Sequence, residues 1–174
     1  MSSSRAVFLD RDGVLTRERP DYVKTPEELE VLAGIGPPLR DLRKMGFQLV
    51  ILTNQSVVGR GLTTEEELES IHEKLRSELK RMACSIDAIY YCPHLPGAGC
   101  SCRKPKPGLI LRAAKDLGID VASSWMIGDK AIDVEAAERA GCRSVRVGTN
   151  LGDLRQAVST IIRAEERDRR GRTT

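Results

Sequence analysis

Two carboxylates follow a short apolar run near the start of the sequence. Asp10 and Asp12 come directly after the apolar residues 6–9, and Gly13 follows them and lets the chain turn. Like charges this close raise each other's proton affinity unless a cation lies between them. A solvated turn after an edge strand is the structural alternative, and it leaves the pair unexplained. We therefore predict a metal or phosphate site at this position.

Three later segments carry groups that complement this pair. One supplies a hydroxyl and two amides, which can hold phosphoryl oxygens. Another supplies fixed cations before a predicted helix, and the last supplies further carboxylates beside a lysine. In chain order these residues are Thr53, Asn54, Gln55, Arg103, Lys104, Asp129, Lys130 and Asp133.

Short apolar runs alternate along the chain with longer stretches of helical periodicity. Strands and helices in alternation predict an α/β fold, a doubly wound parallel sheet with helices on both faces. Such sheets bind ligands at the carboxyl ends of their strands, which here are at Asp10, Thr53, Cys92 and Gly128. The apolar runs are residues 6–9, 49–52, 88–91, 124–127 and 144–147, and the helical stretches are 37–45, 65–82, 108–117 and 132–140.

The length and composition are typical of a globular protein with one core. The chain has 174 residues, of which 40% are hydrophobic and 30% charged, so we expect a single domain over residues 1–174. Much of the formal net charge of +3 comes from the basic C-terminal tail, residues 163–174, which we expect to be a solvated helix end. The near-neutral remainder argues against a dedicated nucleic-acid binder.

The sequence offers no sign of a membrane or export segment. Its apolar runs are shorter than the roughly 18 residues of a membrane helix, and residues 1–5 lack the apolar stretch of a secretory signal. Five cysteines are an odd number, and three of them lie within eleven residues, which favours metal binding in a reducing compartment over disulfides. We therefore expect a cytoplasmic protein.

Four metal-ligating side chains gather in one segment rich in proline and glycine. They form two pairs with one residue between the members, which is enough for a closed tetrahedral Zn²⁺ site. Such a site has no open position, so we expect a structural role, tethering the loop that carries Arg103 and Lys104. Cys84 and Cys142 lack partners at ligand spacing and should pack as small apolar residues, and His72 should be a surface or packing histidine. The predicted zinc ligands are Cys92, His94, Cys100 and Cys102.

Taken in order, the motifs resemble those of the haloacid dehalogenase (HAD) superfamily. They are Asp-x-Asp-Gly, Thr-Asn, a lone lysine before a helix, and Gly-Asp-x-x-x-Asp, and the resemblance covers residues 5–148. It implies a Rossmann-like three-layer sandwich without a large cap domain, and a phosphomonoester hydrolase. It also implies that Asp10 is the nucleophile that forms an aspartyl-phosphate and that Asp12 is the general acid and base.

The same resemblance implies a Mg²⁺ site and a phosphoryl site. Magnesium would be held by the carboxylates of Asp10 and Asp129 and by the backbone carbonyl of Asp12. Asp133 would orient Lys104 or a metal-bound water, or else cap its helix. The phosphoryl group would be bound by Thr53, Asn54 and Lys104, with Lys130 as a further cation.

Within the superfamily, the zinc loop resembles two groups, the heptose 1,7-bisphosphate phosphatases and the histidinol-phosphate phosphatases. Residues 21–28, 53–61 and 100–108 look like the first group, whereas the short spacing of five residues between His94 and Cys100 also occurs in the second. We expect removal of the 7-phosphate of D-glycero-D-manno-heptose 1,7-bisphosphate, with histidinol phosphate as the alternative substrate. The candidate substrate-binding residues are Arg11, Tyr22, Asn54, Gln55, Ser56, Arg60, Arg103 and Lys130.

Some of these assignments carry alternatives. We expect Arg11 to be mainly structural, with its side chain pointing away from the carboxylates, while Arg103 or Arg60 could meet a second phosphate. A 3'-phosphatase acting on nucleic-acid ends and a non-catalytic zinc module share some of the features. The lack of an aromatic stacking platform weighs against the first, and the intact motif aspartates weigh against the second. We expect a monomer acting on a small phosphorylated metabolite, with no nucleic-acid or membrane partner.

Overall fold

The computed structural model describes residues 4–148 and 151–171, without the side chains of 151–153. The expectations for residues 1–3 and for the end of the basic tail, 172–174, lie outside the described residues. Five parallel strands form one sheet in the order β3-β2-β1-β4-β5, as the alternating pattern predicts. The strands are β1 (Arg5–Leu9), β2 (Phe47–Asn54), β3 (Ala88–Cys92), β4 (Trp125–Gly128) and β5 (Arg143–Arg146).

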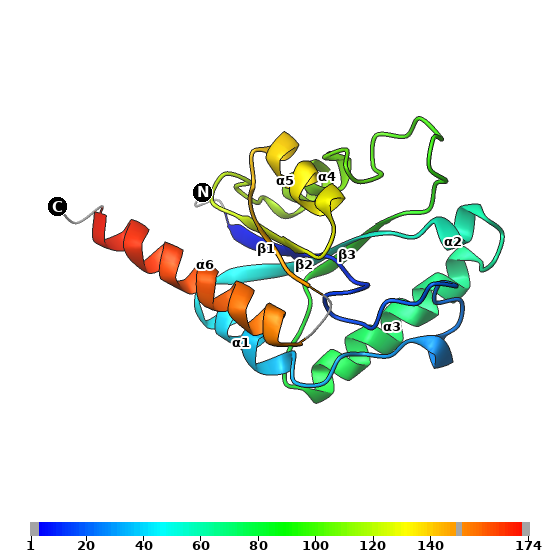
Figure 1. The fold of residues 1–174 in the computed structure, drawn as a ribbon, viewed down its shortest axis with the longest axis horizontal. Coiled ribbons are helices and arrows are strands. Elements are labelled where there is room, and N and C mark those ends of the chain that lie inside the picture. The colour runs from blue at the N-terminus through cyan, green and yellow to red at the C-terminus, as the bar shows by residue number, and fades with distance from the viewer. Residues whose placement is uncertain (1–3, 149–150, 172–174) are drawn as a thin grey trace.

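Helices cover both faces of this sheet and give three layers (Figure 1). The four helices predicted from periodicity are present, and the sequence pattern missed η1, α2 and the part of α6 before the predicted helix end at 163–174. The helices are η1 (Pro26–Glu28), α1 (Gly36–Lys44), α2 (Ser56–Gly59), α3 (Glu65–Arg81), α4 (Gly108–Leu117), α5 (Ala131–Ala140) and α6 (Leu151–Gly171).

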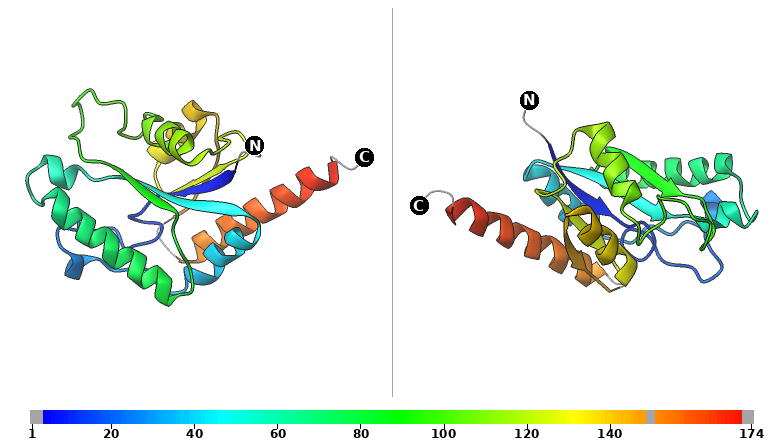
Figure 2. Two further views of the ribbon diagram at one scale, coloured as in Figure 1. Left: turned by 180° about the vertical axis from the view of Figure 1, so that it is seen from behind. Right: turned by 90° about the horizontal axis from the view of Figure 1, so that it is seen from above.

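Two apolar clusters fill the space between the layers. Successive side chains of β1 point to opposite faces, so Val7 and Leu9 pack with α1, α3 and α6, while Ala6 and Phe8 pack with α4 and α5. The further views show the same division, with α4 and α5 on one side of the sheet and the remaining long helices on the other (Figure 2). The strands are buried on both faces, which explains why they read as continuous apolar runs.

The packed core extends beyond residues 5–148, the part of the chain that the resemblance covers. Leu154, Ala157, Val158 and Ile161 of α6 are buried in the cluster that also contains α1. Glu165 belongs to the predicted solvated tail, yet it is buried and accepts a hydrogen bond of 2.9 Å from the indole of Trp125. The expectation of a solvated helix end is confirmed for residues 166–171.

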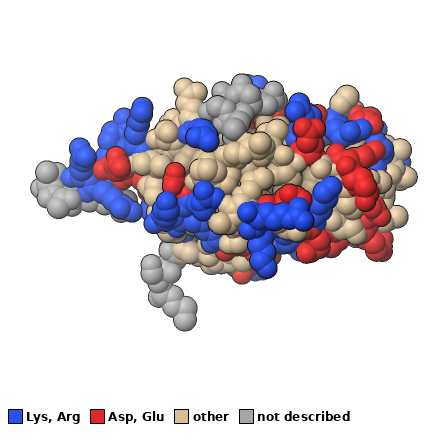
Figure 3. Space-filling view, turned by 90° about the horizontal axis from the view of Figure 1, so that it is seen from below, with Lys and Arg blue, Asp and Glu red and all other residues tan. Residues whose placement is uncertain are grey.

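Charged side chains are distributed unevenly over the surface. Lys and Arg gather at the end of the molecule where α6 protrudes, and Asp and Glu gather toward the opposite end (Figure 3). Among the described residues, no helix combines the length and apolar character that crossing a membrane requires.

Candidate active site

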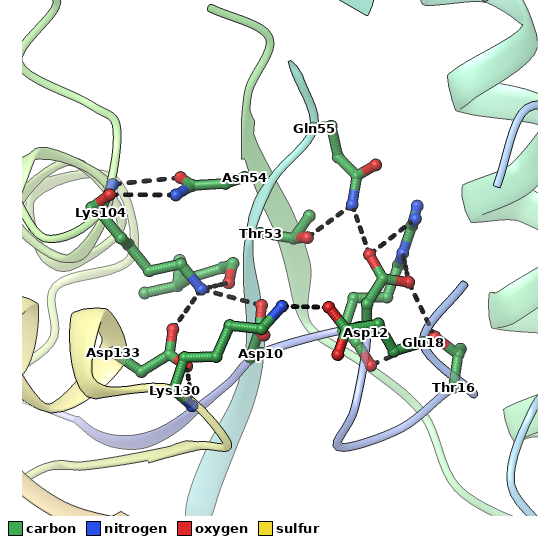
Figure 4. Close-up of polar contacts among 12 residues, drawn as sticks. Asp10, Asp12, Thr16, Glu18, Thr53, Asn54, Gln55, Lys104, Lys130 and Asp133 are labelled. Atoms are coloured by element: carbon green, nitrogen blue, oxygen red, sulfur yellow. Dashed lines mark hydrogen bonds and ion pairs between the residues drawn. The ribbon is translucent and has the colours of Figure 1, made fainter. Parts of the chain in front are cut away.

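The carboxyl ends of the three central strands bring the predicted motifs together. Leu9 at the end of β1 pairs with Ile51 of β2 and Ile127 of β4, so the residues that follow them lie at the same edge of the sheet. Asp10 and Thr53 line a pocket of about 370 Å³ at this edge. The close-up shows the acidic and cationic side chains of the motifs converging there (Figure 4).

Lys104 is the cation at the centre of this edge. Its Nζ atom lies 2.8 Å from Asp10 Oδ1, 2.6 Å from Asp133 Oδ1 and 2.8 Å from the carbonyl oxygen of Leu52. The side chain is buried, and although burial opposes its charge, the carboxylates of Asp10 and Asp133 raise the pKa of Lys104. A fixed ammonium group therefore lies beside the predicted nucleophile, as the sequence suggested.

Asn54 holds the loop that carries this lysine. Its Oδ1 accepts a hydrogen bond of 3.1 Å from the Lys104 backbone N–H, and its Nδ2 donates one of 3.1 Å to the Lys104 carbonyl. Both polar atoms of the amide are thus engaged, as the paired dashed lines of Figure 4 show. These contacts indicate a positioning role for Asn54, which also lines the pocket, so its contact with a phosphoryl group stays a prediction.

Asp133 fulfils both of the structural roles considered for it. One carboxylate oxygen pairs with Lys104, and the other accepts a hydrogen bond of 3.1 Å from the Lys130 backbone N–H, at the start of α5. Gly128 makes this close approach possible, because a Cβ atom at that position would overlap the Asp133 carboxyl group. Lys130 lies at the rim, where its Nζ pairs with Glu18.

Three carboxylates form a second cluster beside Lys104. Ligand oxygens of Asp10, Asp129 and Asp133 all lie within 4.8 Å of one another. Burial is the largest cause of the shift that raises the pKa of Asp10 to about 7, even though Lys104 favours its ionised form. Burial also raises the pKa of Asp129, whose Oδ1 is buried with no hydrogen-bond partner among the described residues. The donor set and the unpaired oxygen fit a hard divalent cation such as Mg²⁺.

Gly13 shapes the other wall of this cluster. It adopts φ = +88°, a left-handed conformation that favours glycine, and a Cβ atom at this position would overlap the Asp129 carboxylate. The turn after Asp12 and the carboxylate of Asp129 can approach closely only because the side chain is absent. Glycine in the Asp-x-Asp-Gly motif is therefore needed for the cation site as well as for the turn.

The carboxylate of Asp12 is held by three neighbouring side chains. Arg11 donates from Nε and Nη2 at 3.1 and 3.0 Å, Thr16 donates at 3.0 Å, and Gln55 donates at 2.9 Å. Burial alone would raise the pKa of Asp12, but the charge of Arg11 and these hydrogen bonds hold it below its usual range. The expectation that Arg11 points away from the carboxylates is wrong, because the turn after β1 folds its guanidinium back onto Asp12. Arg11 is 1% exposed and does not line the pocket, so this geometry gives it no direct access to a substrate.

The predicted zinc ligands form a separate cluster next to the pocket. The Sγ atoms of Cys92 and Cys100 lie 3.7 Å apart, and His94 Nδ1 lies 3.5 Å from Cys92 Sγ and 3.3 Å from Cys102 Sγ. Two Zn–S bonds of about 2.3 Å at a tetrahedral angle would place their sulfurs about 3.8 Å apart. The arrangement therefore fits a four-coordinate Zn²⁺. Cys84 and Cys142 are buried among apolar residues, as predicted.

The zinc cluster is continuous with the loop that enters the active site. Arg103 follows Cys102 directly, lines the pocket, and donates from Nη1 to the carbonyl of His94 at 3.1 Å. Lys106, which is exposed, donates to the carbonyl of Cys100 at 2.5 Å. The loop from 92 to 106 is thus tied to itself around the predicted metal position, and this fixes the approach of Lys104 to the strand ends.

Most of the candidate substrate-binding residues meet at the pocket. Tyr22 and Arg60 face each other across its rim, with the guanidinium 5.5 Å from the centre of the ring. Sequence reasoning missed Glu18 and Arg19, which also line the pocket and lie on the irregular segment after β1. Their only sequence signal was a charged run close to the Asp-x-Asp-Gly motif. The predicted residues found in the lining are Asp10, Asp12, Tyr22, Thr53, Asn54, Gln55, Ser56, Arg60, Arg103, Lys104 and Lys130.

Comparison with known proteins agrees with this site. A family model described as HAD-hydrolase-like matches residues 101–165. The D-glycero-beta-D-manno-heptose-1,7-bisphosphate 7-phosphatase of Haemophilus ducreyi is 42% identical over 154 residues, covering 83% of this chain and 84% of that protein. The enzyme of the same name from Escherichia coli K12 is 42% identical over 153 residues, covering 84% of this chain and 77% of its own. The chain belongs to the HAD-like phosphatases.

Comparison of this HAD-like phosphatase with solved structures also finds a heptose bisphosphate phosphatase. The crystal structure of D,D-heptose 1,7-bisphosphate phosphatase from B. bronchiseptica, complexed with magnesium and phosphate, superposes with a TM-score of 0.83 at 33% identity. The alignment covers 92% of this chain and 99% of that one. The fold expected from the motifs, a parallel sheet with helices on both faces, is therefore confirmed.

Proposed function

We propose that this HAD-like phosphatase removes the 7-phosphate of D-glycero-beta-D-manno-heptose 1,7-bisphosphate. The observation that carries the proposal is a pocket with cations at two levels, Lys104 beside Asp10 at the bottom and Arg60 and Arg103 at the rim. A bisphosphate presents two anionic groups at a distance from each other, and this arrangement can neutralise both. The names of relatives at 42% identity favour the same substrate.

The reaction would proceed through a phosphorylated Asp10. One oxygen of its carboxylate attacks phosphorus, and the bond from phosphorus to the sugar oxygen breaks as Asp12 transfers a proton to that oxygen. The donor is the protonated form of Asp12, which is the minor form because the charge of Arg11 lowers the pKa of this carboxyl group. Asp12, now ionised, then takes a proton from a water that attacks the aspartyl-phosphate. Inorganic phosphate leaves and Asp10 is regenerated, so the cycle returns both carboxyl groups to their starting state.

A cation site adjoins this reaction. The carboxylates of Asp10 and Asp129 and the backbone carbonyl of Asp12 would hold Mg²⁺, and the unpaired Asp129 oxygen supports this assignment. A bound Mg²⁺ supplies positive charge to the phosphoryl oxygens and to the attacking carboxylate. Lys104 contributes a second positive charge from the opposite side of Asp10.

The remaining polar groups of the pocket would bind the phosphoryl oxygens and the sugar. Thr53 follows directly from β2 and accepts a hydrogen bond of 2.7 Å from Gln55, which leaves its hydroxyl proton for a phosphoryl oxygen. Ser56 opens α2 at the pocket wall. Tyr22 and Lys130 lie farther out, where they can meet the sugar and its second phosphate.

Zinc would serve the structure only. The four ligands Cys92, His94, Cys100 and Cys102 would fill a tetrahedral shell, leaving no position for a substrate. The chemistry of the pocket supports a small phosphorylated metabolite as the substrate. We further propose a monomeric cytoplasmic enzyme of one domain with no nucleic-acid or membrane partner.

Histidinol phosphate is the second candidate substrate. The observation that favours it is the short zinc loop, in which five residues separate His94 from Cys100 and only Pro96 reaches the pocket. A short loop leaves the rim open for a substrate without a second phosphate. The cationic rim of the pocket favours the bisphosphate over this candidate.

Kinetic comparison tests the proposal. We expect kcat/KM for the heptose bisphosphate to exceed that for histidinol phosphate by at least about 100-fold, because the rim cations act only on the former. The reaction should require added Mg²⁺ and should be absent from Asp10→Asn. Comparable or reversed kcat/KM values would contradict the substrate assignment, and phosphate release by Asp10→Asn would contradict the mechanism.

A further inference from the structure

Arg11 is a buried cation for which the proposed chemistry has no direct use. Its side chain is 1% exposed, and it is the largest of the fully buried side chains among the described residues. A guanidinium removed from water is stable only where its charge and its donors are paired. The contacts of this side chain therefore indicate what it is for.

The pairing of Arg11 with Asp12 is bidentate. Nε donates to Oδ1 at 3.1 Å and Nη2 donates to Oδ2 at 3.0 Å, so the planes of the guanidinium and the carboxylate are locked together. Thr16 adds a hydrogen bond to Oδ1, and Gln55 adds one to Oδ2. Each carboxylate oxygen thus accepts two hydrogen bonds, and these fix the side chain in one orientation at the pocket wall.

His72 closes the space behind the guanidinium. It is 1% exposed, its Nε2 lies 3.5 Å from Arg11 Nη1, and its ring packs against Tyr91 with the ring centres 5.7 Å apart. Burial is the main cause of a pKa lowered to about 3, so the imidazole is neutral and can accept from Nη1. Arg11 is consequently held from both sides and has no open path to solvent.

We propose that Arg11 is a positioning residue that holds the Asp12 carboxylate where it can exchange protons with the leaving oxygen and then with water. The inference rests on the proposed function, since it assumes that Asp12 is the general acid and base. The alternative is a purely structural ion pair. The two roles differ in how a substitution of Arg11 affects substrates with different leaving groups.

Leaving-group chemistry separates these roles. A sugar alkoxide leaves only if it receives a proton, whereas p-nitrophenolate is a weak base and departs without one. The value of kcat/KM covers the steps up to departure of the leaving group and excludes the later attack of water. Displacing the acid should therefore lower kcat/KM for an alkyl phosphate and spare it for p-nitrophenyl phosphate. A loosened fold would lower both.

The test measures kcat/KM for heptose bisphosphate and p-nitrophenyl phosphate with saturating Mg²⁺. The variants are Arg11→Met, Arg11→Lys and Asp12→Asn, with Arg11→Met also combined with Asp12→Asn. We expect Arg11→Met to lower the value for the bisphosphate by about 100-fold and to change that for the aryl phosphate by less than about 5-fold. Arg11→Lys should recover part of the loss, because an ammonium group can keep one of the two hydrogen bonds. In the Asp12→Asn background, Arg11→Met should cause no further loss.

Equal losses on both substrates would overturn the inference while leaving the proposed function standing. Failure of the unmodified protein to hydrolyse either substrate would overturn the proposed function and the inference with it. Circular dichroism and thermal unfolding accompany each variant, and if Arg11→Met does not fold, the comparison is made with Arg11→Lys. Additive losses in the double variant would also count against a role that acts through Asp12.

Discussion

Lys104 Nζ and Asp10 Oδ1 lie 2.8 Å apart, although 94 residues separate them in the chain. The contact joins the end of β1 to the loop of the predicted zinc site, so the cation and the proposed nucleophile come from distant segments of the chain. Because both side chains are buried, this pair contributes strongly to the charge environment in which a phosphoryl group would be bound.

Replacing Lys104 should therefore remove transition-state stabilisation. We expect Lys104→Met to lower kcat/KM by about 100- to 1,000-fold, because one fixed donor to the phosphoryl oxygens is lost. The uncompensated Asp10 and Asp133 should also lower the free energy of unfolding by about 3 kcal/mol in the absence of Mg²⁺. Lys106→Met is the matched control, since this exposed lysine lies two residues away and should leave activity within about 2-fold. Similar activity for both variants would contradict the role of Lys104.

Metal analysis tests the Cys/His cluster. We expect the purified chain to contain zinc in a one-to-one ratio, and Cys102→Ser to contain much less and to unfold at a lower temperature. The loop that positions Lys104 would then loosen, so kcat/KM should fall as well. Cys84→Ala removes a buried thiol outside the cluster and should retain its zinc. A chain that binds no zinc, or a Cys102→Ser variant with full zinc content, would refute the site.

His72 makes stability depend on pH in a defined range. Its pKa is about 3 in the folded protein against 6.5 for the free side chain, chiefly because of burial. Below pH 6.5 the unfolded chain takes up a proton that the folded chain does not, so the free energy of unfolding decreases as the pH falls. The group contributes no pH dependence above that range. Between pH 7 and pH 5, urea unfolding should show that the unmodified protein loses about 2 kcal/mol more stability than His72→Gln, a comparison in which the contributions of other groups such as Asp10 cancel. Parallel pH profiles for the two proteins would disprove this assignment.

Arg60 should act on the substrate rather than on the fold. We expect Arg60→Ala to raise KM for the heptose bisphosphate by about 10-fold, with little change in kcat, because it removes a contact to the second phosphate. KM for a monophosphate should not change. Arg112→Ala is the control, because Arg112 lies 5.5 Å from the ring of Tyr90, just as Arg60 lies 5.5 Å from that of Tyr22, but does not line the pocket. An equal effect of both substitutions would exclude a specific role for Arg60.

The sheet and most of the site could be predicted because their signals are local. Apolar runs mark the strands, and in a parallel sheet polar residues at the strand ends must converge, which places Asp10, Thr53 and Asp129 at one edge. Helix α6 also had a local signal, the spacing of Leu154, Ala157, Val158 and Ile161. The dense arginines in its second half favoured the interpretation of residues 163–174 as a solvated helix end, which missed the burial of Glu165.

The contacts that could not be predicted depend on the tertiary fold. The bidentate bond from Arg11 to Asp12 requires the backbone of the turn after β1, since neighbouring side chains in an extended segment point apart. The pair of Glu18 and Lys130 joins segments 112 residues apart. Asn54 bonds to the backbone of Lys104, and a sequence gives no information about which backbone groups an amide will reach.

Trapping the covalent intermediate tests the central claim that Asp10 is the nucleophile. Asp12→Asn should accumulate phosphorylated protein when mixed with p-nitrophenyl phosphate and Mg²⁺, because p-nitrophenolate leaves without a proton from residue 12 whereas the base that activates water is missing. Borohydride reduces an aspartyl-phosphate to homoserine, which peptide mass spectrometry can locate after an acid quench. We predict homoserine at position 10 and none in the variant that also carries Asp10→Asn. Homoserine at Asp129 or Asp133, or labelling that persists without Asp10, would contradict the mechanism.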